Sequence, residues 1–95
     1  MLYELSIEAE KDLEDIFDYT NQEYGSAQAL KYVSDFEVCF KGLCNNPTLG
    51  RKRNEIRSGL RSQIHGSHIV FYRIKTNQIR IIRVLHGARD LPRYF

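Results

Sequence analysis

The spacing of apolar residues changes part-way along this chain of 95 residues, and that change limits the folds it can adopt. Between residues 9 and 43 the apolar residues recur every three or four positions, which is the period of an amphipathic helix. After Gly59 they form short runs rich in Ile, Val, Phe and Tyr, a composition typical of β-strands. Two helices followed by several strands predict an α+β fold of two layers.

Start and stop signals divide the first half into two helices. Ser6 offers a side-chain oxygen as the N-cap of the first helix, and acidic residues follow in its first turn. Gly25 can end this helix because glycine adopts the left-handed conformation without steric cost. A second helix begins at Ser26 and stops before Pro47. The short link between them predicts an antiparallel helical hairpin.

Strand signals stand at the start of the chain and throughout its second half. Two-residue turns separate the later runs, so they form a three-stranded antiparallel meander. We predict one antiparallel sheet with the hairpin on one face, in a single domain spanning residues 1–95. The polar segment 48–58 is predicted to be a loop, and a short exposed tail follows residue 86. The predicted strands are Leu2–Leu5, Leu60–His65, His68–Lys75 and Gln78–His86.

The last predicted strand has apolar and basic residues on both faces. Strict alternation places Arg83 on one face, together with Ile79, Ile81 and Leu85. The opposite face then holds Ile82, Val84, Arg80 and His86. Such a strand suits the centre of a sheet that packs on helices on one side and has a working surface on the other.

Charge is distributed unevenly between the two halves. Residues 1–50 contain three Lys and ten Asp or Glu, a net charge of −7. Residues 51–95 contain nine Arg and two Lys against two acids, a net charge of +9, and every Arg of the chain lies there. This asymmetry predicts a basic surface for an anionic partner, supported by an acidic layer.

Several classes of protein are disfavoured. The chain lacks an apolar run long enough for a membrane span and the features of a signal peptide, so we expect a cytoplasmic protein. Two cysteines, Cys39 and Cys44, without a Cys/His cluster predict partly buried thiols and neither a metal nor a cofactor. No Gly-x-Ser-x-Gly and no phosphate-binding glycine loop is present.

The basic residues allow two kinds of function. Guanidinium groups bind phosphate oxygens in pairs and remain charged, so they suit a metal-free nuclease site. In that hypothesis His65 or His86 acts as the base, Tyr94 as the acid, and Arg61, Arg83 and Arg89 stabilise the phosphate. In the other hypothesis the same surface only binds its partner and no bond is broken.

Motifs in both halves of the chain resemble the ParE toxins of the RelE/ParE superfamily. The resemblance covers nearly the whole chain in order. It rests on Gly59-Leu60-Arg61, Gly66–Arg73 and Ile79–Asp90 in the second half, and on Ser6, Ala9, Asp12-Leu13, Ile16, Asn46-Pro47 and Gly50-Arg51 in the first. The fold of that superfamily is the strand, helix, helix, three-strand order predicted above.

The resemblance implies the toxin of a type II toxin–antitoxin module. A ParD-like antitoxin with a ribbon-helix-helix domain would neutralise it. Its target would be DNA gyrase, which ParE toxins inhibit by binding and trapping the cleaved-DNA complex, without catalysis. The RelE branch instead cuts mRNA on the ribosome, a pattern partly met by Arg51, Arg53, Arg61, Arg89 and Tyr94. A non-toxic nucleic-acid-binding module is a third alternative.

Two sets of residues follow as hypotheses. For inhibition of the target we select residues predicted to converge at one end of the sheet, together with the tail: Arg61, Arg83, His86, Arg89, Asp90, Arg93, Tyr94 and Phe95. For antitoxin binding we select an apolar groove between the hairpin and the sheet, rimmed by a basic loop: Leu13, Phe17, Phe36, Phe40, Arg51, Lys52 and Arg53.

Overall fold

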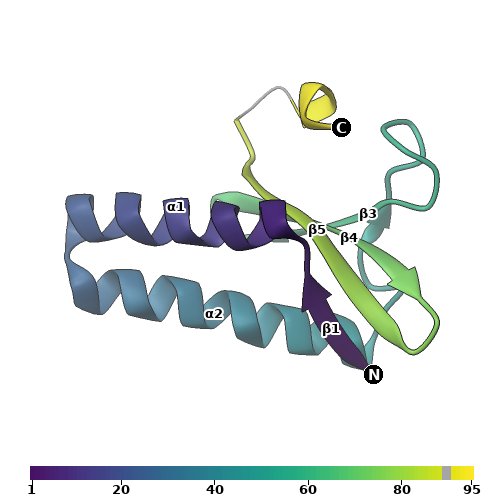
Figure 1. Cartoon of the computed structure of the whole chain (residues 1–95), viewed down its shortest axis with the longest axis horizontal. Helices are drawn as coiled ribbons and strands as arrows, with labels where there is room; N and C mark the ends of the chain where they lie inside the picture. Colours follow the sequence, from purple (N-terminus) through teal and green to yellow (C-terminus); the bar gives the residue numbers. More distant parts are fainter. Residues whose placement is uncertain (89–90) are drawn as a thin grey trace.

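The computed structural model describes residues 1–88 and 91–95, and it has two layers (Figure 1). A helical hairpin packs on one face of a sheet, and the turn between the two helices projects away from that sheet. The elements in chain order are β1 (Leu2–Leu5), α1 (Ile7–Tyr24), α2 (Ser26–Asn45), β2 (Arg51–Lys52), β3 (Arg61–His65), β4 (His68–Lys75), β5 (Gln78–His86) and the 3₁₀ turn η1 (Leu91–Tyr94). The predicted α+β fold is confirmed.

The helix boundaries agree with the capping signals. The Ser6 hydroxyl accepts the N–H of Ala9 at 2.9 Å and donates to the carbonyl of Ile82 at 2.7 Å, so it joins the start of α1 to β5. Gly25 has φ of 92°, in the left-handed region, and separates α1 from α2. The second helix ends at Asn45, directly before Asn46-Pro47.

The sheet has five strands in the order β1-β5-β4-β3-β2 and is mixed. The prediction of a wholly antiparallel sheet was wrong, because β1 lies beside β5 and runs parallel to it. The loop prediction for residues 48–58 was wrong at Arg51–Lys52, which form β2 against residues 61 and 62 of β3. A strand of two residues is too short to leave an alternating pattern in the sequence.

An irregularity in β5 changes which residues share a face. Phe71 pairs with Arg83 and Tyr72 pairs with Ile81, so Ile82 is an extra residue in the ladder. The predicted alternation was therefore wrong after Ile81. Val84 lies with Ile79 and Ile81 in the core beneath the helices, whereas Leu85 lies in a separate cluster on the opposite face.

Each face of the sheet has its own apolar cluster. The helix-facing cluster is the larger and includes Phe36, Phe40, Val70, Tyr72 and Ile79, all at most 2% exposed. The opposite side, here called the second face, is built on Leu60, Phe71 and Leu85, and the C-terminal residues Leu91, Tyr94 and Phe95 pack against it. The tail is thus folded back onto the sheet.

Tyr72 fixes the segment that leads into β2. Its hydroxyl donates to the carbonyl of Pro47 and accepts the N–H of Gly50, both at 2.8 Å. A Cβ at position 50 would overlap this hydroxyl, so the close approach requires glycine. Burial raises the pKa of Tyr72, because the charged phenolate would lose its hydration.

Candidate functional site

The residues selected for target inhibition lie on both faces of the sheet. Arg61 is paired with Tyr72, and paired residues point to the same side, so Arg61 lies on the helix-facing face. Its guanidinium donates to the carbonyl of Gly50 at 2.8 Å. His86 is paired with His68 on the same face and is exposed at the end of β5. These residues do not form one cluster with Arg83.

Arg83 and the end of the tail meet on the second face. The Arg83 guanidinium carbon lies 5.4 Å from the centre of the Tyr94 ring, and the Phe95 ring lies 4.9 Å from that of Phe71. Arg93 is exposed on η1, while Arg89 and Asp90 lie outside the described residues. The expectation of an exposed tail was wrong at Leu91, Tyr94 and Phe95, which are partly buried against the second face, whereas Pro92 and Arg93 are exposed.

Arg57 contacts the last residue of the tail, Phe95. Arg57 was not selected from the sequence as a site residue. Its Nη2 donates to the main-chain oxygen of Phe95 at 2.8 Å, and its guanidinium carbon lies 5.7 Å from the Phe95 ring centre. Arg57 and Arg83 therefore each place a guanidinium over one aromatic ring of the tail. The sequence contained no signal for this contact, since the two partners are 38 residues apart.

Asp12 links α1 to the open edge of β5. One carboxylate oxygen accepts the Arg83 Nε–H at 2.8 Å and the Val84 N–H at 2.9 Å, and the other accepts Arg83 Nη2–H at 2.9 Å. This hydrogen bonding raises the pKa of Arg83 and keeps the guanidinium charged. A signal existed, because Asp12 follows Ala9 by three positions and precedes Ile16 by four, on the apolar stripe of the helix.

All three histidines lie side by side at one end of the sheet, where His65 is paired with His68 and His68 with His86. The Tyr32 hydroxyl is 2.7 Å from Nδ1 of His68, and the His68 and His86 rings are 5.4 Å apart. The His65 ring lies 4.5 Å from that of Phe36. His65 and His68 are both partly buried, with their rings beside Phe36 and Tyr32 of α2.

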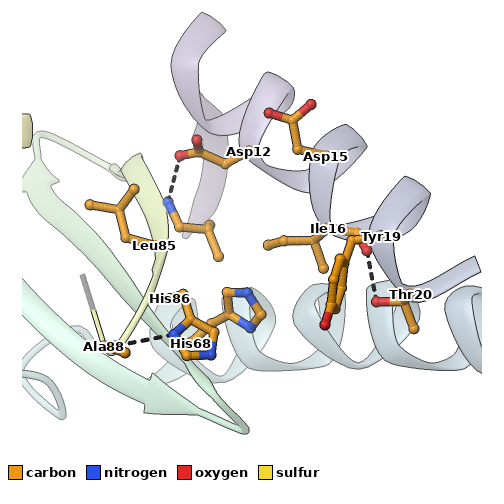
Figure 2. A pocket seen from close by; sticks show the side chains of 10 residues that line it. Asp12, Asp15, Ile16, Tyr19, Thr20, His68, Leu85, His86 and Ala88 are labelled. Atoms are coloured by element: carbon orange, nitrogen blue, oxygen red, sulfur yellow. Dashed lines mark hydrogen bonds between the residues drawn. The ribbon is translucent and has the colours of Figure 1, made fainter. Parts of the chain in front are cut away.

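A cavity of about 350 Å³ opens between α1 and the end of β5. In Figure 2 the two imidazoles of His68 and His86 lie side by side beneath α1, and Ile16 and Tyr19 project from α1 toward the cavity. His86 is oriented by the Ala88 N–H, which donates to its Nδ1 at 3.1 Å. The mixture of apolar and polar walls suits an amphipathic side chain from a partner protein.

The residues selected for antitoxin binding differ in their accessibility. Arg51 and Lys52 are exposed on β2, whereas the Arg53 guanidinium carbon lies 5.7 Å from the Phe71 ring centre and bonds Glu55. Leu13 and Phe17 on α1 are partly buried, and Phe36 and Phe40 are core residues. The predicted open groove between hairpin and sheet was wrong at Phe36 and Phe40, because core packing fills that space.

The two thiols are not suited to nucleophilic chemistry. Cys39 and Cys44 are partly buried free thiols that pack against the helix-facing cluster, as predicted. Burial raises the pKa of both, which favours the unreactive protonated form. Within residues 1–88 and 91–95, no group of three His, Cys, Asp or Glu side chains could hold a metal ion.

Comparisons with known proteins agree on one family. A family model described as the ParE toxin of the type II toxin–antitoxin system parDE matches residues 3–91. Toxin ParE1 of Caulobacter vibrioides is 38% identical over 88 residues, which cover 93% of this chain and 91% of that protein. This chain belongs to the ParE toxin family. It is therefore a toxin of a ParDE type II toxin–antitoxin system.

Further relatives support membership of the ParE family. Toxin ParE1 of Mycobacterium tuberculosis is 38% identical over 92 residues, covering 96% of this chain and 94% of that protein. A solved structure described as the chromosomal ParDE TA system from P. aeruginosa superposes with a TM-score of 0.75 at 26% identity, covering 90% of this chain and 92% of the other. In the part of this ParE-family toxin that the structure describes, neither helix is long and apolar enough to cross a membrane.

Proposed function

We propose that this toxin inhibits DNA gyrase by binding it and trapping its cleaved-DNA complex, without breaking a bond itself. Membership of the ParE family over residues 3–91 is the observation that supports this proposal most strongly. Gyrase works on DNA in the bacterial cytoplasm, so we place the toxin there. A ParD-like antitoxin with a ribbon-helix-helix domain is the proposed partner that neutralises it.

The positions of the basic residues favour binding over RNA cleavage. A RelE-like or metal-free nuclease site would need Arg61 and Tyr94 to reach one phosphate. Arg61 lies on the helix-facing face, whereas Tyr94 packs on the second face, so the sheet stands between them. His65 and His86, the two candidate bases, also lie on the side opposite Tyr94.

Two parallel assays test the target. The purified toxin is incubated with gyrase and supercoiled plasmid, and separately with ribosomes programmed with mRNA. We expect linear plasmid after the complex is denatured, and intact mRNA. Cut mRNA without linear plasmid would show the RelE-like activity instead, and no effect in either assay would reject both targets.

The tail and Arg83 are the proposed contact with the target. Arg83, Tyr94 and Phe95 lie on or against the second face, and Arg93 is exposed on η1. Expression of a chain that ends at Gly87 should no longer arrest growth. Undiminished growth arrest by the truncated chain would refute a role for the tail.

The proposed antitoxin contact involves the accessible residues of the original set, namely Leu13, Phe17 and the basic segment Arg51–Arg53. Charges at the rim of an interface mainly accelerate association. Replacing Arg51, Lys52 and Arg53 with Ala should therefore slow binding of the ParD-like protein at low salt. An association rate that stays unchanged across a salt series would exclude these three residues from the interface.

A further inference from the structure

The second face contains arginines of two kinds. Arg53, Arg80 and Arg83 each have an acidic partner, at 2.8 Å from Glu55, 2.6 Å from Glu4 and 2.8 Å from Asp12. Arg57, Arg73 and Arg93 have no ion pair with an acidic side chain among the described residues. None of these three arginines is therefore paired with an acidic side chain of the described residues, although Arg57 Nη2 already donates to the main-chain oxygen of Phe95.

Contacts place these three arginines in one connected region. The Arg73 guanidinium lies beside Gly59, where a Cβ would be 3.0 Å from its Nη1. Gly59 is two residues from Arg57, which in turn bonds the main chain of Phe95. Phe95 is two residues from Arg93 on the same docked tail. The three arginines therefore lie on three segments that contact one another, namely β4, the β2–β3 loop and the tail.

Aromatic rings fix the guanidinium groups of this face. Arg53, Arg57 and Arg83 stack on Phe71, Phe95 and Tyr94 at 5.4–5.7 Å from the ring centres. A stacked guanidinium loses less conformational entropy when it binds. Of these three, Arg53 and Arg83 already donate to Glu55 and Asp12, so Arg57 is the stacked arginine that has no acidic side-chain partner among the described residues. Planar donors held in fixed positions match the paired oxygens of a phosphate.

We infer that the second face binds the phosphate backbone of DNA directly through Arg57, Arg73 and Arg93. The inference deepens the proposed function, since the cleaved-DNA complex of gyrase presents DNA next to the enzyme. Phosphodiester is the chemistry recognised, and both DNA and RNA could supply it. We assign DNA because the proposed gyrase target holds cleaved DNA, and RNA is compared with it in the test.

Binding to DNA without gyrase tests the inference separately from the proposed target. Fluorescence anisotropy of a labelled DNA duplex is measured across a salt series for the wild type and for the R57Q/R73Q/R93Q variant. Three lost phosphate contacts should lower the salt slope by up to about 3. Wild-type affinity should then fall about 40-fold more than that of the variant between about 50 and about 200 mM salt.

The K11Q/K31Q/K41Q variant is the matched control, because it removes the same net charge from exposed positions of the helices. It should retain the wild-type slope. Equal slopes for the wild type and the R57Q/R73Q/R93Q variant would overturn the inference, as would an equal loss in both variants. Tighter binding of single-stranded RNA than of DNA, or equal competition by polyglutamate, would also overturn it. DNA binding without linear plasmid would refute the gyrase target and leave the inference standing.

Discussion

The helical layer and the second face of the sheet differ in how they use charge. On the helices, lysines form exposed i,i+4 pairs with acids, such as Lys11–Asp15 and Lys31–Asp35, and most acids point to solvent. Exposed pairs of this kind contribute little stability. On the second face, arginines lie over aromatic rings and bond the main chain of the tail.

The uneven distribution of charge along the sequence therefore corresponds to two different structural arrangements. The acidic half keeps most of its charge in solvent, above an apolar core. The basic half keeps part of its charge at a structured surface formed by β4, the β2–β3 loop and the tail. Asp12 is the exception on the helices, since its carboxylate is 11% exposed and bonds Arg83.

The largest expected effect is in the core beneath the helices. Phe36→Ala should lower the free energy of unfolding by about 3–5 kcal/mol, because a fully buried ring is removed and a cavity remains. Val38→Ala on the same helix, at a site 70% exposed, should change it by less than about 0.5 kcal/mol. Chemical denaturation measures both, and equal losses would contradict the distinction between core and exposed surface.

Asp12→Ala tests the contribution of the one helix acid described above as bonded to Arg83 of β5. It removes the acidic partner of Arg83 and the acceptor of the Val84 N–H, so unfolding should become easier by about 3 kcal/mol. Asp15→Ala removes only an exposed pair with Lys11 and should cost less than about 1 kcal/mol. If thermal denaturation gave the two variants the same stability, Asp12 would be an ordinary surface acid.

Tyr72→Phe should cost about 1–3 kcal/mol, because the Gly50 N–H loses its acceptor in a buried position. The phenol also predicts a pH dependence. Its pKa is raised by burial, so its stabilising effect is complete below about pH 10 and is lost as the pH rises through the folded value. The variant should lose less stability than the wild type in an alkaline titration, and identical pH profiles would refute this.

Arg57→Gln should have the smallest effect of these substitutions. It should weaken the docking of the tail on the sheet by about 0.5–1 kcal/mol. The change removes the guanidinium from Phe95 and leaves the core intact. Hydrogen exchange should accelerate at residues 93–95 while exchange in β4 stays unchanged. Unaltered exchange in the tail would show that Phe95 is held by apolar packing alone.

The sequence was sufficient to predict the two helices and the strands β1, β3, β4 and β5 in their order, because capping residues, turn residues and periodicity are local signals. It failed where the pairing of distant segments decides the outcome. The extra residue Ile82 reversed the faces after Ile81, and no local pattern marks a bulge there. The separation of Arg61 from Tyr94, and the docking of Phe95 on Phe71, likewise depend on contacts between segments far apart in the chain.

We propose that the second face acts on a gyrase–DNA complex and that the exposed lysines of the helical layer do not take part. Linear plasmid formed by gyrase is measured for the wild type, R57Q/R73Q/R93Q and K11Q/K31Q/K41Q, each first shown to be folded by circular dichroism. We predict that the second-face variant needs at least about 10-fold more protein, and that the helical variant matches the wild type. Equal amounts of linear plasmid from all three proteins would contradict the account.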